Sequence, residues 1–215
     1  ILEVATDEGI ESRVDETGNV LLAGEGQPRV TLQSHMDMVC EKGSGVDHDF
    51  EKDPIRLREE DGWLTADGTT LGADDGIGVA VSLATITADS GFDSVDYLFT
   101  VDEERGLTGA LGLDSGYIRG NKLINLDGEE FGTFTIGCAG GGQTTIELPV
   151  GFDYRDSSNT VRLSVQGLFG GHSGADIDKG RANAIKLLGR VLKTFEGLPF
   201  ELAADEGIAE ALASR

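Results

Sequence analysis

Three short apolar runs, separated by helical patterns, constrain the fold of this chain more than any other feature. The runs cover residues 29–34 (RVTLQS), 95–101 (VDYLFTV) and 122–126 (KLINL), and each has the length and composition of a buried strand. Residues 75–88 form an apolar stretch that tolerates glycine and 108–113 a shorter one, and both are typical of helices. Continuous apolar strands that alternate with helices predict the α/β fold class, with a sheet covered on both faces.

Potentially reactive side chains follow each of these strands. His35 and Asp37 come after the first strand, the acidic run 102–104 (Asp-Glu-Glu) after the second, and Asp127 after the third. In open α/β sheets, binding sites form at the carboxyl ends of the strands. The sequence therefore predicts a functional site at this edge of the sheet.

A second part of the chain follows a Gly-rich stretch at 137–142 (GCAGGG), which could act as a hinge. Residues 161–167 (VRLSVQG) alternate as in a half-exposed strand, and 181–195 carry an apolar stripe at helical spacing. A strand followed by an amphipathic helix predicts the start of an α+β domain. We therefore expect one domain over residues 1–148 and a second over 149–215.

Charge and hydropathy exclude several classes of protein. The 215 residues include 39 Asp and Glu against 17 Lys and Arg, a net charge of −22 that repels nucleic acid. Because no apolar run approaches the roughly 20 residues of a membrane span, we expect no membrane partner. Cys40 and Cys138 provide no disulfide framework and fit a reducing, cytoplasmic compartment. Such cysteines are more often small buried residues than metal ligands.

Each candidate side chain also has an ordinary structural explanation. His35 and Asp37 could be a surface histidine beside an acid, or an imidazole that a carboxylate orients for metal binding. Asp74 suits a helix start and a metal bridge equally well, whereas Asp75 is better explained as a helix N-cap. The run 102–104 is either a solvated loop or a set of carboxylates held by cations, one of them left free as a general base.

Taken together, His35, Asp74, Glu104 and Asp127 offer the nitrogen and oxygen ligands that bind zinc or manganese. A pair of divalent metals would also offset the repulsion among the successive carboxylates of the acidic run. The residues by themselves therefore favour a site for divalent metals.

Four motifs, in this order along the chain, resemble those of the M20 metallopeptidase family. They are residues 34–42 (SHMDMVCEK), 71–78 (LGADDGIG), 102–109 (DEERGLTG) and 170–178 (GGHSGADID). The likeness is strongest to the aminoacyl-histidine dipeptidase branch, also called Xaa-His dipeptidase or peptidase D. It implies dinuclear metal-dependent hydrolysis of dipeptides of Xaa-His type, by a zinc-peptidase-like α/β/α domain with an inserted α+β lid domain.

The resemblance implies two zinc ions per active site, with Mn²⁺ or Co²⁺ as alternatives, and a role for each matching residue. His35 resembles a ligand of the first metal, and Asp37 the carboxylate that orients this histidine. Asp74 resembles the aspartate that bridges both metals, and Asp127 the remaining ligand of the first. Glu104 resembles a ligand of the second metal.

The other implied roles concern proton transfer and substrate binding. Glu103 resembles the general base that takes a proton from the attacking water. His172 resembles a lid histidine that reaches the substrate carbonyl, and Asn183 a polar substrate contact on the lid. Residues 1–148 would then be part of the catalytic domain and 149–215 part of a lid through which a cytoplasmic homodimer forms.

The position of the one remaining histidine, His48, departs from the family pattern. M20 enzymes complete the second metal with a histidine near the carboxyl terminus, but His48 lies soon after the first motif and is expected at the surface or near the site. We therefore expect an incomplete portion of a longer protein or a crippled site, and predict that residues 1–215 alone bind at most one metal tightly and are inactive. Two alternatives stay open: another M20 amidohydrolase, such as an aminoacylase or deacetylase, and a non-catalytic metal-binding or dimerising fragment.

Overall fold

The chain forms two compact units, Ile1–Ile136 and Gly137–Arg215. The computed structural model describes residues 1–88, 94–128, 130–138, 140, 142, 144–147, 149, 161–171 and 176–197. The division between the units falls at the start of the Gly-rich stretch 137–142. The sequence pattern places a domain boundary later, after residue 148, and that assignment stays a prediction.

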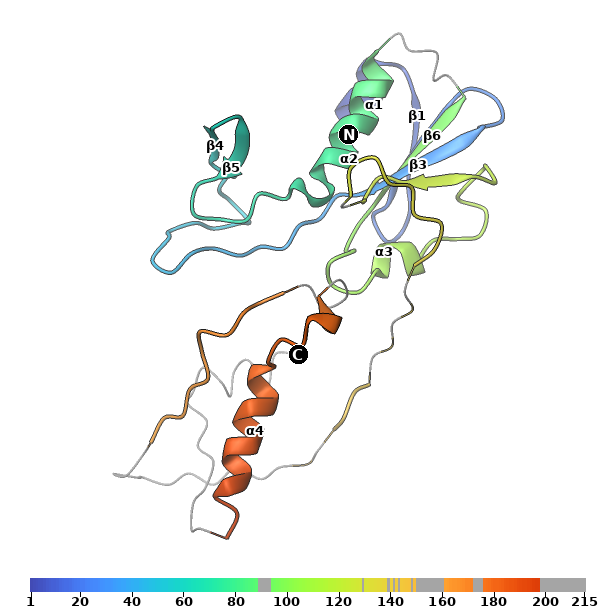
Figure 1. Ribbon diagram of the computed structural model, residues 1–215. Coiled ribbons are helices and arrows are strands. Elements are labelled where there is room, and N and C mark those ends of the chain that lie inside the picture. The colour runs from blue at the N-terminus through green and yellow to red at the C-terminus, as the bar shows by residue number, and fades with distance from the viewer. Residues whose placement is uncertain are drawn as a thin grey trace. The chain divides into compact units, whose positions relative to one another are not determined.

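The first unit is built on a five-stranded sheet (Figure 1). Its elements in chain order are α1 (Leu2–Asp7), β1 (Glu11–Val14), β2 (Val20–Ala23), β3 (Val30–His35), β4 (Leu57–Glu60), β5 (Trp63–Ala66), α2 (Ala73–Thr87), β6 (Val95–Thr100), α3 (Thr108–Leu111) and β7 (Leu123–Asn125). Strands β4 and β5 form a separate hairpin. The described elements of the second unit are a 3-10 turn (Ile177–Lys179) and α4 (Ala184–Thr194).

The order of the strands brings three carboxyl ends to one edge of the sheet. The order is β1-β2-β6-β3-β7, and β3 pairs in parallel with both β6 and β7. In this register Gln33 lies opposite Leu98 on one side and Asn125 on the other. Strands β1 and β2 extend the sheet in antiparallel fashion beyond β6. Since parallel strands end on the same side, the polar segments that follow β3, β6 and β7 leave the sheet together.

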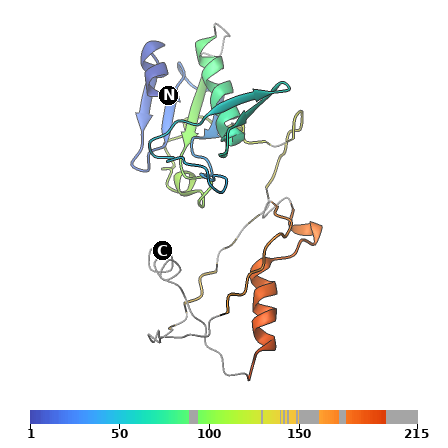
Figure 2. The same cartoon turned by 90° about the vertical axis from the view of Figure 1, so that its left-hand side faces the viewer.

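Helices α1 and α2 lie on one face of the sheet (Figure 2), and the hydrophobic core lies between them and this face. Tyr97 and Phe99 on β6 and Leu22 on β2 point to this face and are buried. They pack with Ala5 of α1 and Leu83 of α2. This packing fixes α2 alongside β3. Among the described residues, no helix has the length and apolar character needed to cross a membrane.

The structure confirms most of the expected elements and corrects two. The predicted strands correspond to β3, β6 and β7, and the predicted helices to α2, α3 and α4. Residues 161–167 were expected to form a half-exposed strand, but this described segment carries none. Alternation of side chains specifies a face but supplies no neighbouring strand for the backbone hydrogen bonds. The side chains of β7 were expected to be buried and are exposed, because β7 is an edge strand that pairs with β3 alone.

Candidate metal centre

His35 ends β3 and is the buried centre of the candidate site. Its side chain is 1% exposed, with Nε2 3.0 Å from Oδ1 of Asp74 and Nδ1 2.9 Å from the backbone oxygen of Asp37. Burial disfavours the imidazolium, but the hydrogen bond with Asp74 and the charge of Asp127 outweigh burial and raise the pKa of His35. The imidazole is thus held from both sides and surrounded by negative charge.

Asp37 connects the end of β3 with the loop that follows β6. Its Oδ1 accepts the backbone N–H of Glu103 at 3.0 Å and its Oδ2 that of Glu104 at 3.1 Å. Burial raises the pKa of Asp37, but hydrogen bonds from backbone N–H groups, first those of Glu103 and Glu104, together with nearby His35 more than offset burial, so the pKa is lowered. The carboxylate lies 3.5 Å from Nδ1 of His35, whose closer partner is the backbone oxygen of Asp37. Asp37 therefore holds the loop that carries the acidic run 102–104, which we call the acidic loop. Orientation of His35 by the carboxylate of Asp37 stays a prediction.

The start of α2 places two aspartates in different environments. Asp74 and Asp75 have non-helical backbone angles, and the peptide bond between them is cis. Buried Asp75 accepts the N–H of Gly78 at 3.0 Å, as an N-cap does, and the N–H of His35 at 3.2 Å. Asp75 therefore ties α2 to the end of β3. The side chain of Asp74 is exposed and faces the imidazole of His35.

Asp127 follows β7 and brings a third candidate ligand to the same place. His35, Asp74 and Asp127 each offer one ligand atom, and these atoms lie within 4.8 Å of one another. Burial, hydrogen bonding with Asp74 and the charge of Asp74 raise the pKa of Asp127 to about 7. A divalent cation would replace the proton that this crowding favours, so the donor set fits a metal.

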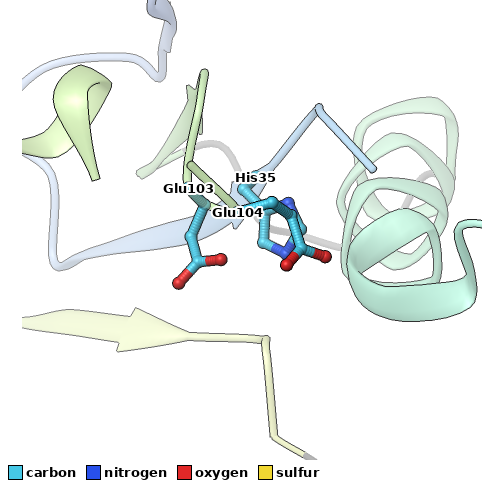
Figure 3. Close-up of side chains that lie close together, drawn as sticks. All are labelled: His35, Glu103 and Glu104. Carbon is cyan, nitrogen blue, oxygen red and sulfur yellow. The ribbon is translucent and has the colours of Figure 1, made fainter. Parts of the chain in front are cut away.

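The two glutamates after β6 extend in different directions (Figure 3). His35, Glu103 and Glu104 form a second group whose ligand atoms lie within 4.8 Å of one another. Burial and the nearby charges of Asp74 and Glu103 raise the pKa of Glu104. The structure thus brings all five candidates for metal binding and proton transfer to one edge of the sheet.

A pocket of about 160 Å³ opens beside the site, on the face of the sheet opposite the core. It is lined by Glu103 and Asp127, by Gln33 and Asn125 from the strands, and by apolar side chains around α3. Sequence analysis did not single out Gln33 or Asn125. For Asn125 the available signal was a lone amide side chain at the end of the apolar strand β7, whereas Gln33 lies among other polar residues of β3.

Three other predictions from the sequence concern residues that are not part of the candidate metal centre. His172 falls outside the described residues. Asn183 caps α4, since its Oδ1 accepts the N–H of Lys186 at 2.9 Å, and its substrate contact stays a prediction. The surface position considered for His48 is wrong: it is 4% exposed and packs edge-on against Phe50.

The expected burial of the two cysteines is also wrong, because both are exposed. Cys40 lies in the loop after β3 and Cys138 at the start of the second unit, and neither segment belongs to a helix or strand. Small apolar side chains are buried only where the backbone carries them into a core, which residue type alone does not specify.

Comparison with known proteins identifies relatives that are named as peptidases. No protein-family model matches the chain. The cytosol non-specific dipeptidase of Escherichia coli (strain K12) is 41% identical over 202 residues, which are 87% of this chain and 40% of that protein. The crystal structure of aminoacylhistidine dipeptidase from Vibrio alginolyticus matches at 37% identity with a TM-score of 0.56, over 87% of this chain and 40% of that one.

Both relatives are named as dipeptidases. The chain belongs to the M20 peptidase family. It spans 40% of the length of the two dipeptidases. A tripeptidase from Staphylococcus aureus, 24% identical with a TM-score of 0.50 over 60% of this chain and 36% of that one, shares the fold. The expected α/β fold class of an M20 peptidase is therefore confirmed.

The crowding of Asp74 and Asp127 predicts how the stability of this chain depends on pH when metal is absent. Because folding raises the pKa of Asp127 from 3.8 to about 7, its contribution to stability is complete below the lower value and is lost as the pH rises to the higher one. In chelator, lowering the pH from about 7.5 to about 5 should therefore favour folding more in the unchanged protein than in Asp127→Asn. Melting temperatures at both pH values measure this. An equal response of the two proteins would contradict a raised pKa at Asp127.

Proposed function

We propose that the complete protein containing this chain is a dinuclear metal-dependent dipeptidase. The convergence of His35, Asp74 and Asp127 at one edge of the sheet carries the proposal, because three ligands of mixed nitrogen and oxygen type suit a catalytic metal. Two relatives named as dipeptidases support it, and the name of one, a cytosol dipeptidase, supports a cytoplasmic location.

His35, Asp74 and Asp127 would hold one metal, and Asp74 and Glu104 would contribute to the second. When bound, two divalent cations, of which zinc is proposed and Mn²⁺ or Co²⁺ are alternatives, lower the pKa of water and polarise a peptide carbonyl. Glu103 would take the proton of the attacking water and deliver it to the leaving amine. Asp37 would keep Glu103 in place, since it accepts the backbone N–H of that residue.

The substrate would be a small dipeptide, of Xaa-His type, as the name of the Vibrio relative suggests. His172 and Asn183 would contact it from the lid over residues 149–215, through which a homodimer would form. These assignments rest on the family motifs.

Metal removal and restoration test the proposal. Chelation of the complete protein should abolish histidine release from an Xaa-His dipeptide, and Zn²⁺, Mn²⁺ or Co²⁺ should restore it. His35→Ala should stay inactive after metal addition and lose at least one bound metal. The matched control is His48→Gln, at a histidine away from the ligand groups, which should keep its metals.

Two results would contradict the proposal. Bound metal with cleavage of N-acyl amino acids and no cleavage of dipeptides would indicate another M20 amidohydrolase. Absence of tightly bound metal in the complete protein would indicate a non-catalytic chain.

A further inference from the structure

A row of three polar side chains crosses the sheet beside the candidate metal centre. Asn125 on β7 donates from Nδ2 to Oε1 of Gln33 on β3 at 2.7 Å. Gln33 donates from Nε2 to the hydroxyl of Thr100 on β6 at 3.1 Å. The Thr100 hydroxyl donates to the backbone oxygen of Ser34 at 3.4 Å. The row therefore joins all three parallel strands through side chains.

Each strand in the row carries a candidate ligand or base shortly afterwards. Gln33 lies two residues before His35, and Asn125 two residues before Asp127. Thr100 ends β6, two residues before the acidic run 102–104 begins. Asn125 also holds Asp127 directly, because its Oδ1 accepts the backbone N–H of Asp127 at 3.2 Å.

The row lies where the backbone pairing of the strands ends. The last backbone bond between β7 and β3 in the described chain runs from the N–H of Leu126 to the oxygen of Gln33, at 2.8 Å. On the other side of β3, the N–H of Met36 donates to the oxygen of Thr100 at 2.8 Å. Beyond these bonds, side chains rather than neighbouring strands accept the backbone N–H groups. Asn125 does so for Asp127, as Asp37 does for the acidic loop.

We propose that Gln33 and Asn125 are positioning residues that set the spacing of the metal ligands His35 and Asp127. The proposal rests on the proposed function. Groups that orient metal ligands commonly change metal affinity about 10–100-fold when they are replaced. Gln33 on β3 and Asn125 on β7 form the last paired position of these strands before His35 and Asp127. The hydrogen bond between their side chains therefore fixes how far apart the two strands, and with them the two candidate ligands, lie.

The test compares Gln33→Met with Tyr97→Phe in the complete protein. Methionine keeps the length of Gln33 and removes both of its hydrogen bonds. Tyr97→Phe is the matched control, because it removes one partly buried hydrogen bond, that from the Thr85 hydroxyl at 3.2 Å, on the opposite face of the same sheet. Co²⁺ affinity and the visible absorption spectrum of bound Co²⁺ report on the ligands, and melting temperature reports on the fold.

Gln33→Met should weaken Co²⁺ binding about 10–100-fold and alter the spectrum, whereas Tyr97→Phe should change the melting temperature alone. Thr100→Val, which removes the other end of the row with little change in shape, should alter the spectrum in the same direction, and it replaces Gln33→Met if that variant does not fold. A Co²⁺ affinity and spectrum unchanged in both row variants would overturn the positioning role and leave the proposed function intact. No Co²⁺ binding by the unchanged protein would overturn both.

Discussion

Replacement of Glu103 by alanine is expected to lower the proposed dipeptidase turnover of the complete protein about 10²–10⁴-fold, with its metal content unchanged. Glu103 lies beside the His35–Asp74–Asp127 group without belonging to it, and it lines the neighbouring pocket. The loop should keep its conformation, because Asp37 holds it through backbone N–H groups that the substitution leaves in place. Turnover at saturating dipeptide and metal analysis of the same sample measure both parts of this expectation.

Glu104→Ala is the matched control at the adjacent position. It should lose metal as well as activity, since its carboxylate is proposed as a ligand of the second metal. If Glu103→Ala loses a metal and recovers activity when metal is added, the roles of the two glutamates are exchanged. The second ligand group, which contains both residues with His35, makes this comparison informative.

Replacement of Arg119 by methionine is expected to destabilise the first unit by about 3–5 kcal/mol, because it leaves a buried carboxylate without its counter-ion. Asp96 lies within β6 with its side chain 0% exposed. Arg119 donates from Nε to Oδ2 of Asp96 at 3.0 Å and from Nη2 to Oδ1. Arg119 also donates to the backbone oxygen of Gly24 at 2.8 Å, and Gly24 donates its N–H to Asp96 at 3.0 Å. The pair therefore ties the end of β2 and the segment before β7 to β6.

Arg13→Met is the control for this prediction. Arg13 pairs with Glu11 at 2.8 Å, but both side chains are exposed, so the loss should be about 0–1 kcal/mol. The free energy of unfolding from urea denaturation measures both variants. Equal effects would show that burial of Asp96 adds nothing to the pair. The double variant Asp96→Asn, Arg119→Met should recover part of the stability, because it removes the stranded charge.

Much of the site was predictable because its residues follow elements that local sequence specifies. The apolar runs of β3 and β6 indicate buried strands, and the spacing of turns and helices indicates parallel ones. His35, Glu103, Glu104 and Asp127 are therefore expected at the same edge of the sheet, where these parallel strands end. The candidate ligands could be predicted without knowledge of any contact between them.

The partners that hold these residues were not predictable, because they lie far apart in sequence. The bond from Glu103 to Asp37 spans 66 residues, and that from Asn125 to Gln33 spans 92. Asp96 is an acidic residue within the largely apolar run 95–101, and its role depends on Arg119, 23 residues away. His48 illustrates the same limit, since its burial depends on how a loop folds back.

The sequence by itself determined the fold class, the edge of the sheet that carries the candidate site and the chemical type of its candidate ligands. These properties depend on hydrophobic runs of strand length and on side chains directly next to them, which are local patterns. Tertiary structure alone decided three features. Asp127 lies close enough to Asp74 for its pKa to be raised, and Asp37 accepts the backbone N–H groups of Glu103 and Glu104. Gln33 forms hydrogen bonds with Asn125 on β7 and Thr100 on β6. Such hydrogen bonds and pKa shifts depend on distances of a few ångströms between side chains that only the packed sheet brings together.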